Sequence, residues 1–121
     1  MKRTLLPPLR TLSKDSDFRR VYRKGKSYAT SRLVIYAMKR YAKLYGAGDV
    51  RVGLSVSGKV AKAVTRNKLR RRLKEILRLD SEKLARGFDM VIVARNPSAD
   101  AGYAELEGDV RYLLGKLGVS R

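Results

Sequence analysis

The chain has 121 residues, of which 44% are hydrophobic and 33% charged, a composition that allows one globular domain with a single modest core. It contains neither cysteine nor histidine, which excludes disulfides, thiolate metal sites and the side chain that most often serves as a general base. No apolar run approaches the ~20 residues of a membrane span, and residues 1–8 lack the apolar stretch of a secretory signal. We therefore expect a cytoplasmic protein.

The net charge of +18 is concentrated in the first part of the chain. Residues 1–74 contain 22 Lys and Arg against three acids, whereas residues 75–121 contain seven against eight. Solubility alone does not require this separation, whereas a polyanion partner explains it, because each neutralised phosphate releases condensed counterions. A solvated basic surface is the plain alternative. An anionic membrane is also a polyanion, but the basic segments alternate with strand-like runs rather than forming one amphipathic anchor.

Residues 1–12 are expected to form an extended arm, because its Pro-Pro pair excludes helix, and residues 13–121 a single domain. The domain begins with a short helix, whose start is favoured by Asp15 and Asp17 and whose end is placed at Gly25. Three residues at helical spacing form its apolar face: Phe18, Val21 and Tyr22.

Two strands are predicted next. Residues 32–38 are rich in β-branched and aromatic residues and apolar on both faces, so one face should pack on the core while a helix or a ligand covers the other. Residues 39–49 contain two glycines and indicate a hairpin-like connection, and residues 50–56 alternate between apolar and polar as a half-buried strand does. The sequence also leaves room for a short strand over residues 25–31.

Residues 59–79 contain no proline or glycine and favour helix. Val60 and Val64 lie off the apolar stripe of this helix, so either its first turns pack on another element or it begins later. Residues 90–94 indicate an inner strand, and residues 96–98 are expected to cap a last amphipathic helix whose apolar residues run from Tyr103 to Leu117. This order predicts an α+β fold, a single-domain sandwich of helices on a small mixed sheet.

No set of side chains indicates catalysis. Asp15 and Asp17 lie on opposite flanks of a short helix, Asp49 sits among glycines, and the later acids have the positions of helix ends or surface residues. No pair suggests a general acid and base, and residues 46–48 lack the lysine and helix start of a phosphate-binding loop. The sequence therefore predicts neither catalytic residues nor metal ligands.

The basic helix is the most distinctive feature. Four of its cations recur every four residues and share one face: Lys62, Arg66, Arg70 and Lys74. Three more widen the charge to a neighbouring face: Lys68, Arg71 and Arg72. Like charges at this spacing destabilise an isolated helix by a few tenths of a kcal/mol, roughly, for each pair, so their density indicates a polyanion that relieves the repulsion. Asn67 between them can read a sugar hydroxyl or a base edge, and a solvated helix face is the alternative.

Aromatic residues lie among further cations. Phe18, Tyr22 and Tyr36 are accompanied by six Lys and Arg between positions 19 and 32. Aromatic side chains beside a basic groove hold single-stranded RNA by stacking on its bases. Plain core packing is the alternative, above all for the two aromatics of the short helix.

With these features the chain resembles a known family, the protein subunit of bacterial ribonuclease P, from about Leu12 to Arg95. The most specific part is the run AVTRNKLRR at residues 63–71, which is similar to the family's Arg-Asn-Arg signature helix. Three other blocks agree in order: DFRRVYRKGKS at 17–27, RVGLSVS at 51–57 and DMVIVAR at 89–95. Two departures stand out: Lys68 in place of the signature's second arginine, and Gly58 at a commonly basic position.

The resemblance implies a left-handed βαβ crossover and a role in removing the 5′ leader from precursor transfer RNA. It also implies that an RNA subunit carries out the Mg²⁺-dependent hydrolysis and binds most of the metal, while the protein binds the leader and supports cleavage. The residues it assigns to catalytic-RNA binding are Arg66, Asn67, Lys68, Arg70, Arg71 and Lys74. Those it assigns to the leader are Phe18, Tyr22, Tyr36, Lys62 and Arg66.

The expected partners are the catalytic RNA and precursor transfer RNA, with no membrane and no obligate protein partner. Two other functions fit the composition. A ribosomal protein has similar size and charge but would sediment with ribosomal subunits. An autonomous nuclease would cleave the precursor without any RNA subunit.

Overall fold

The computed structural model describes residues 9–40, 50–84 and 87–119. Five strands and three α-helices are found in these ranges, in the order β1 (Leu9–Thr11), α1 (Asp15–Lys24), β2 (Lys26–Ala29), β3 (Leu33–Lys39), β4 (Val50–Ser55), α2 (Ala63–Leu79), β5 (Phe88–Ala94) and α3 (Tyr103–Leu117). Two 3₁₀ segments, Ser81–Lys83 and Asn96–Asp100, follow α2 and β5. None of the helices in the described ranges has the length and apolar character to cross a bilayer.

The strands form one mixed sheet in the order β1-β4-β5-β3-β2. β4 is parallel to both β1 and β5, whereas β3 is antiparallel to β5 and to β2. The α+β sandwich on a mixed sheet is therefore confirmed. Since β4 and β5 are adjacent and parallel, α2 is the crossover between them, and its left-handed sense stays a prediction of the resemblance.

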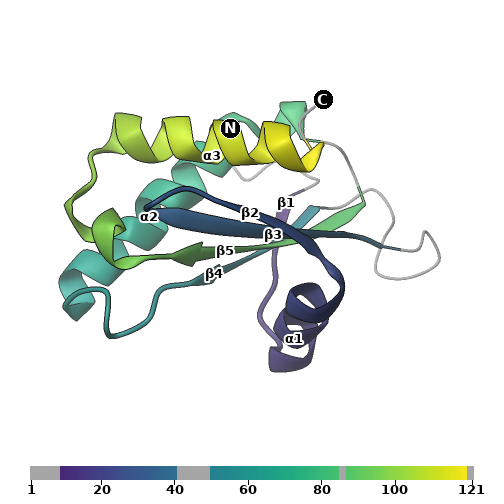
Figure 1. The fold of residues 1–121 in the computed structure, drawn as a ribbon, viewed down its shortest axis with the longest axis horizontal. Coiled ribbons are helices and arrows are strands. Elements are labelled where there is room, and N and C mark those ends of the chain that lie inside the picture. The colour runs from purple at the N-terminus through teal and green to yellow at the C-terminus, as the bar shows by residue number, and fades with distance from the viewer. Residues whose placement is uncertain (1–8, 41–49, 85–86, 120–121) are drawn as a thin grey trace, which may run out of the picture.

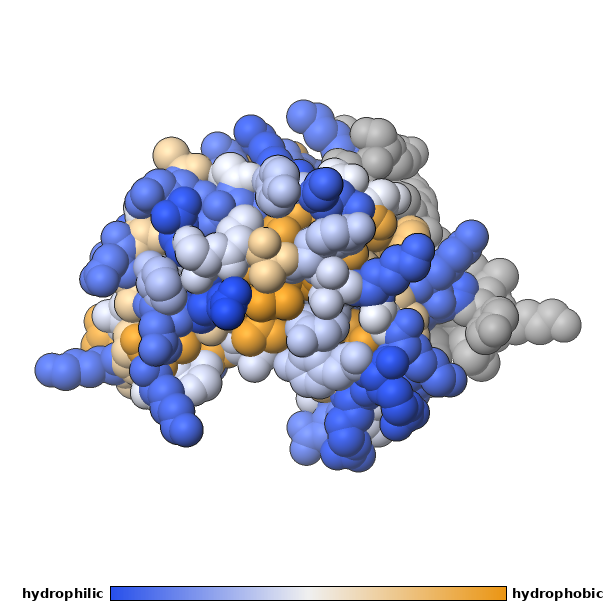
Figure 2. Space-filling model, viewed as in Figure 1, coloured by the Kyte–Doolittle hydropathy of each residue, from blue (hydrophilic) through white to orange (hydrophobic). Residues whose placement is uncertain are grey.

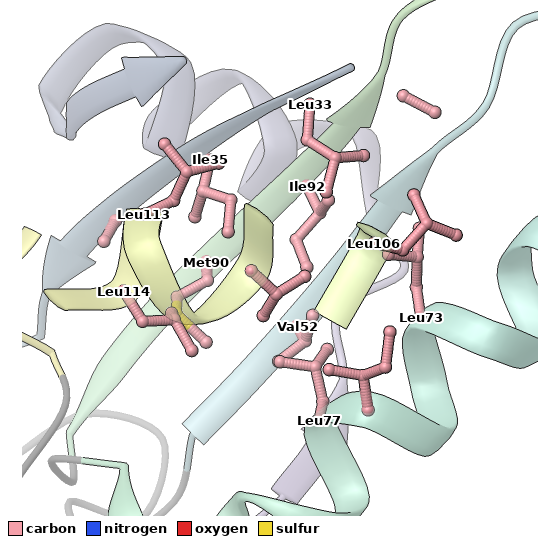
Figure 3. Close-up of a cluster of buried hydrophobic side chains, with 14 of the residues drawn as sticks. Leu33, Ile35, Val52, Leu73, Leu77, Met90, Ile92, Leu106, Leu113 and Leu114 are labelled. Atoms are coloured by element: carbon pink, nitrogen blue, oxygen red, sulfur yellow. The ribbon is translucent and has the colours of Figure 1, made fainter. Parts of the chain in front are cut away.

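One face of the sheet carries the main core. Helices α2 and α3 lie together over this face (Figure 1). Side chains from the sheet and from both helices meet between the layers, as Figure 3 shows for Leu33, Ile35, Val52, Leu73, Leu77, Met90, Ile92, Leu106, Leu113 and Leu114. Burial of these side chains is the main source of stability, at roughly 1.5–3 kcal/mol for each large apolar residue.

The opposite face of the sheet is covered by α1, which lies on the other side in Figure 1. A smaller cluster is buried there, made by Leu12, Val21 and Val91, with Phe18 and Tyr36 packed at its edge. Strand β3 thus contributes alternate residues to both clusters, as its two apolar faces predicted. Helix α1 is only ten residues long, so it covers part of this face.

Three segments differ from the sequence prediction. Residues 96–98 do not cap the last helix but belong to the 3₁₀ segment Asn96–Asp100, and α3 begins at Tyr103 with Gly102 as its N-cap. Leu9–Thr11, the last part of the expected arm, pairs with β4 and belongs to the sheet. Helix α2 begins at Ala63 rather than at residue 59, because a turn closed by the Ser57 Oγ, which accepts the Lys59 N–H at 2.9 Å, precedes it. The later start explains why Val64 is 79% exposed while Val60, still in the loop, packs on the core. The connection expected at residues 39–49 lies mostly outside the described residues.

Candidate nucleic-acid interface

Helix α2 is buried along one stripe and basic elsewhere. Leu69, Leu73, Ile76 and Leu77 are at most 2% exposed and fix the helix on the sheet. The polar residues on the rest of the helix surface are held outward by this anchoring, with Asn67, Lys68, Arg71 and Lys74 exposed and Arg66 and Arg70 half-buried. The sheet thus positions the predicted RNA-binding residues without using any of them in the core.

The cations of this helix are oriented by neutral acceptors. Arg66 Nη1 donates to the Ala61 carbonyl at 2.7 Å, and Arg70 Nη1 donates to Asn67 Oδ1 at 3.1 Å. Arg72, which flanks the stripe, donates to the Ala101 carbonyl at 3.1 Å. Within the described ranges, no ion pair involves any Lys or Arg from position 62 to 74. Seven positive charges therefore lie on this helix and its N-cap without an ion-pair partner among the residues that the structure describes.

Three acids of the described ranges are paired with arginines outside the basic run at 62–74. Glu75 accepts from Arg78 at 2.9 Å on the same helix, and this hydrogen bond lowers the pKa of Glu75. Asp80 accepts from Arg111 at 3.1 Å, and Asp109 accepts from Arg32 at 2.7 Å. The charge separation in the sequence therefore survives in three dimensions as a basic helix surface.

The three aromatic residues come together from α1 and β3. The ring centroids of Tyr22 and Tyr36 are 4.9 Å apart and those of Phe18 and Tyr22 are 6.4 Å apart, both in edge-to-face arrangement. Tyr22 is 39% exposed, and Tyr36 and Phe18 are half-buried. Phe18 and Tyr36 pack at the edge of the smaller cluster, and part of each tyrosine ring stays exposed. Base stacking on these rings stays a prediction.

The surface is hollowed on the α1 side of the sheet. Figure 2 shows the outline indented at its lower edge, with hydrophilic side chains over α1 on one side and over the start of α2 on the other. Lys62 is the N-cap of α2 and Arg66 lies in its first turn. The two cations predicted near the leader thus lie at the start of α2, whereas the aromatic cluster comes from α1 and β3.

Gly53 of β4 determines the height of Phe18 above the sheet. A Cβ at this glycine would overlap the tip of the Phe18 ring, with other ring carbons at 2.9 and 3.0 Å. Gly53→Ala is therefore expected to push Phe18, and with it Tyr22, out of position and to weaken binding of single-stranded RNA about tenfold, the effect of about one stacked base. Fluorescence anisotropy with a short labelled RNA measures this.

Gly108→Ala in α3 is the matched control, because nothing lies within 4 Å of the added methyl group. It should leave RNA binding unchanged and stabilise the protein by about 0.5–1 kcal/mol, as alanine in place of glycine does inside a helix. Equal RNA affinities of the two variants would contradict the assignment of Phe18 and Tyr22.

A buried ion network, missed from the sequence, anchors α1 to the sheet. Asp89 of β5 is fully buried, and it accepts from Arg51 at 2.6 and 2.9 Å and from Arg40 at 2.7 Å. Arg51 also reaches Asp17 of α1 at 3.4 Å. The expectation that Asp89 lies at the surface was wrong, because the register of β4 and β5 sets it directly beside Arg51.

The described residues offer no metal site of protein side chains. They contain no group of three or more carboxylates, imidazoles or thiolates that could surround an ion. The most buried carboxylates, Asp17, Asp80 and Asp89, are each bound by arginine. These side chains therefore do not fit a resident divalent cation.

A family model and individual relatives both match this chain over most of its length. The family model for ribonuclease P matches residues 6–118. The ribonuclease P protein component of Clostridioides difficile is 44% identical over 110 residues, covering 90% of this chain and 92% of the relative. That of Alkaliphilus oremlandii is 43% identical over 106 residues, covering 88% and 89%.

Solved structures share the fold. The ribonuclease P protein of Staphylococcus aureus superposes with a TM-score of 0.81 at 28% identity, over 92% of this chain and 97% of that one. The protein from Thermotoga maritima superposes with a TM-score of 0.73 at 27% identity, over 88% and 94%. The basic helix surface, the aromatic cluster, the fold and the relatives agree, and the chain belongs to the ribonuclease P protein family.

Proposed function

We propose that this chain divides RNA binding between two surfaces: the catalytic RNA is bound by the exposed face of α2, and the 5′ leader of precursor transfer RNA by the hollow beside α1. Membership of the family gives the chain its role in transfer RNA 5′ processing and its partner, ribonuclease P RNA. The observation that carries the proposal is the set of seven cations at 62–74, none of which has an ion-pair partner among the described residues. Such a surface gains the most from a phosphate backbone.

The leader assignment is supported by the chemistry of the hollow. Tyr22 and Tyr36 present partly exposed rings on the α1 side of the sheet, and Lys62 and Arg66 lie at the start of α2. Bases of a single strand stack on aromatic rings while cations follow the backbone. A folded transfer RNA body has its bases paired, so this surface suits an unpaired leader.

In this proposal the RNA subunit supplies the chemistry and binds most of the Mg²⁺. The arginine partners of the buried carboxylates support this division, because they leave those carboxylates committed to the fold. The protein's own contribution is to hold the leader and to reduce repulsion between RNA phosphates. Neither task needs a protein partner. The proposed localisation is the cytoplasm, where precursor transfer RNA is made.

The test is precursor cleavage at low Mg²⁺ with a bacterial ribonuclease P RNA, with and without this protein. Cleavage at the mature 5′ end that needs both components is the expected result. Cleavage by the protein with Mg²⁺ alone would assign the chemistry to the chain instead. RNA binding without stimulation would contradict the proposed role in the holoenzyme.

Tyr36→Ala should weaken binding of a precursor that carries a leader by about 5- to 100-fold, the range for the loss of one stacked base. Binding of mature transfer RNA should be unaffected. Tyr36→Phe keeps the ring and should behave as the wild type, and Tyr112→Ala, at an exposed position of α3, is the matched control. Equal losses for precursor and mature transfer RNA would contradict the leader assignment.

A further inference from the structure

A groove runs between the edge of the sheet and α2, on the face opposite the aromatic cluster. Its volume is about 240 Å³. The side chains of Leu9, Val52, Leu54 and Leu77 form its apolar walls, and Arg70, Lys74, Arg10 and Thr11 also line it. This volume is just below the roughly 300–1,000 Å³ of small-molecule sites, so the groove takes one flat ring system and not a helix.

The edge of the groove offers hydrogen-bonding groups. β1 is the terminal strand of the sheet and pairs only with β4 among the described elements. The outer backbone N–H and C=O groups of such a strand can bind another molecule. The Thr11 side chain lies on the same side as Val52, its partner in the register, and is exposed. An apolar slot with a polar edge matches a nucleobase, which has flat faces and a hydrogen-bonding rim.

The charges beside the groove also favour a nucleotide. Arg70 and Lys74 follow each other by one helical turn, and neither is in an ion pair within the described part of the chain. Cations beside an apolar slot suit a base with its phosphate rather than an apolar peptide. Both residues belong to the α2 surface assigned above to the catalytic RNA, and the leader hollow lies on the other face of the sheet.

We propose that this groove receives a single unpaired nucleotide of ribonuclease P RNA, with its base between β1 and α2 and its phosphate on Arg70 and Lys74. The inference rests on the proposed function and deepens it, because it adds a base-specific contact to a surface otherwise described by charge alone. The contact with the base makes binding depend on the RNA sequence, which phosphate contacts by themselves do not do.

The experiment is chemical probing of base edges in ribonuclease P RNA, combined with affinity at several salt concentrations. In the wild-type complex, an unpaired nucleotide should lose reactivity at its Watson–Crick edge.

Thr11→Trp fills the groove with an indole and suits an edge strand, where aromatic residues are favoured. It should restore the reactivity of that nucleotide and weaken RNA binding about tenfold or more. The slope of log affinity against log salt should fall by no more than about 0.7–0.9, the share of that nucleotide's one phosphate, because the other cations keep their contacts.

Ala104→Trp on the exposed, acidic part of α3 is the matched control and should change neither readout. A wild-type protein that fails to bind the RNA overturns the proposed function together with this inference. Wild-type binding with no protected unpaired nucleotide, or an unchanged affinity of Thr11→Trp, overturns the inference alone and assigns the groove to another occupant, such as a peptide. The wild-type footprint needs no substitution, so the inference stays testable if Thr11→Trp does not fold.

Discussion

Asp89→Ala is expected to destabilise the protein by about 3–5 kcal/mol, the usual effect of removing one partner from a buried ion pair. The substitution leaves the guanidinium groups of Arg40 and Arg51 in the interior without the carboxylate that both contact at 2.6–2.9 Å. Natural domains of this size are stable by only about 5–15 kcal/mol, so the loss is a large share. Urea unfolding followed by circular dichroism measures it.

Asp100→Ala is the matched control for this experiment. It removes the same negative charge from a strongly basic protein, but Asp100 is exposed and forms no ion pair with the described residues. Its free energy of unfolding should stay within about 0.5 kcal/mol of the wild type. If both variants lost the same stability, the cause would be net charge rather than the buried network.

The network also has a consequence for function. Arg51 bridges Asp89 of β5 and Asp17 of α1, so it holds the helix that carries Phe18 and Tyr22 against the sheet. A folded Asp89 variant, examined at low urea and low temperature, should therefore bind the leader more weakly. Its affinity for the catalytic RNA should change little, because α2 is anchored by the other core.

The double variant Arg70→Ala, Arg71→Ala is expected to weaken binding of ribonuclease P RNA about 30-fold at 0.15 M salt. Each lost phosphate contact removes the release of condensed counterions, which lowers the affinity about five-fold at this salt concentration. It also lowers the slope of log affinity against log salt by about 0.7–0.9. For two contacts the slope should fall by about 1.4–1.8. Titrations at four or more salt concentrations separate this change from a loss of folded protein.

A second double variant, Arg78→Ala with Lys83→Ala, is the control for charge. It removes two cations from the same part of the chain, but Arg78 is paired with Glu75 and Lys83 lies beyond the end of α2. The salt slope should therefore stay close to that of the wild type. A slope that falls equally in both variants would show that the chain acts through net charge and not through the face of α2.

Much of the fold was predictable because its signals are local. The alternation of residues 50–56, the two apolar faces of residues 32–38 and the spacing of apolar residues in the last helix each reflect the period of one element. These elements appear in the structure as β4, β3 and α3. The charge on α2 was equally predictable, since a polar residue on a helix with a separate apolar stripe has to face outward.

The site was only partly predictable, because it depends on how α1, β3 and β4 pack together. Helical spacing placed Phe18 and Tyr22 on one face, but it could not say that β3 would set Tyr36 4.9 Å from Tyr22. Nor could it say that Phe18 would rest on Gly53, because a close approach between α1 and β4 depends on how the whole helix sits on the sheet.

By itself, the sequence determined the class of fold, the basic helix and the family, because periodicity, composition and motif spacing are properties of neighbouring residues. Only the tertiary structure decided that Leu9–Thr11 joins the sheet, that Asp89 is buried, and that a groove opens between β1 and α2. Each of these depends on a partner far away in the chain. A three-residue strand has no periodicity of its own, and a carboxylate is buried only where folding brings arginines to it.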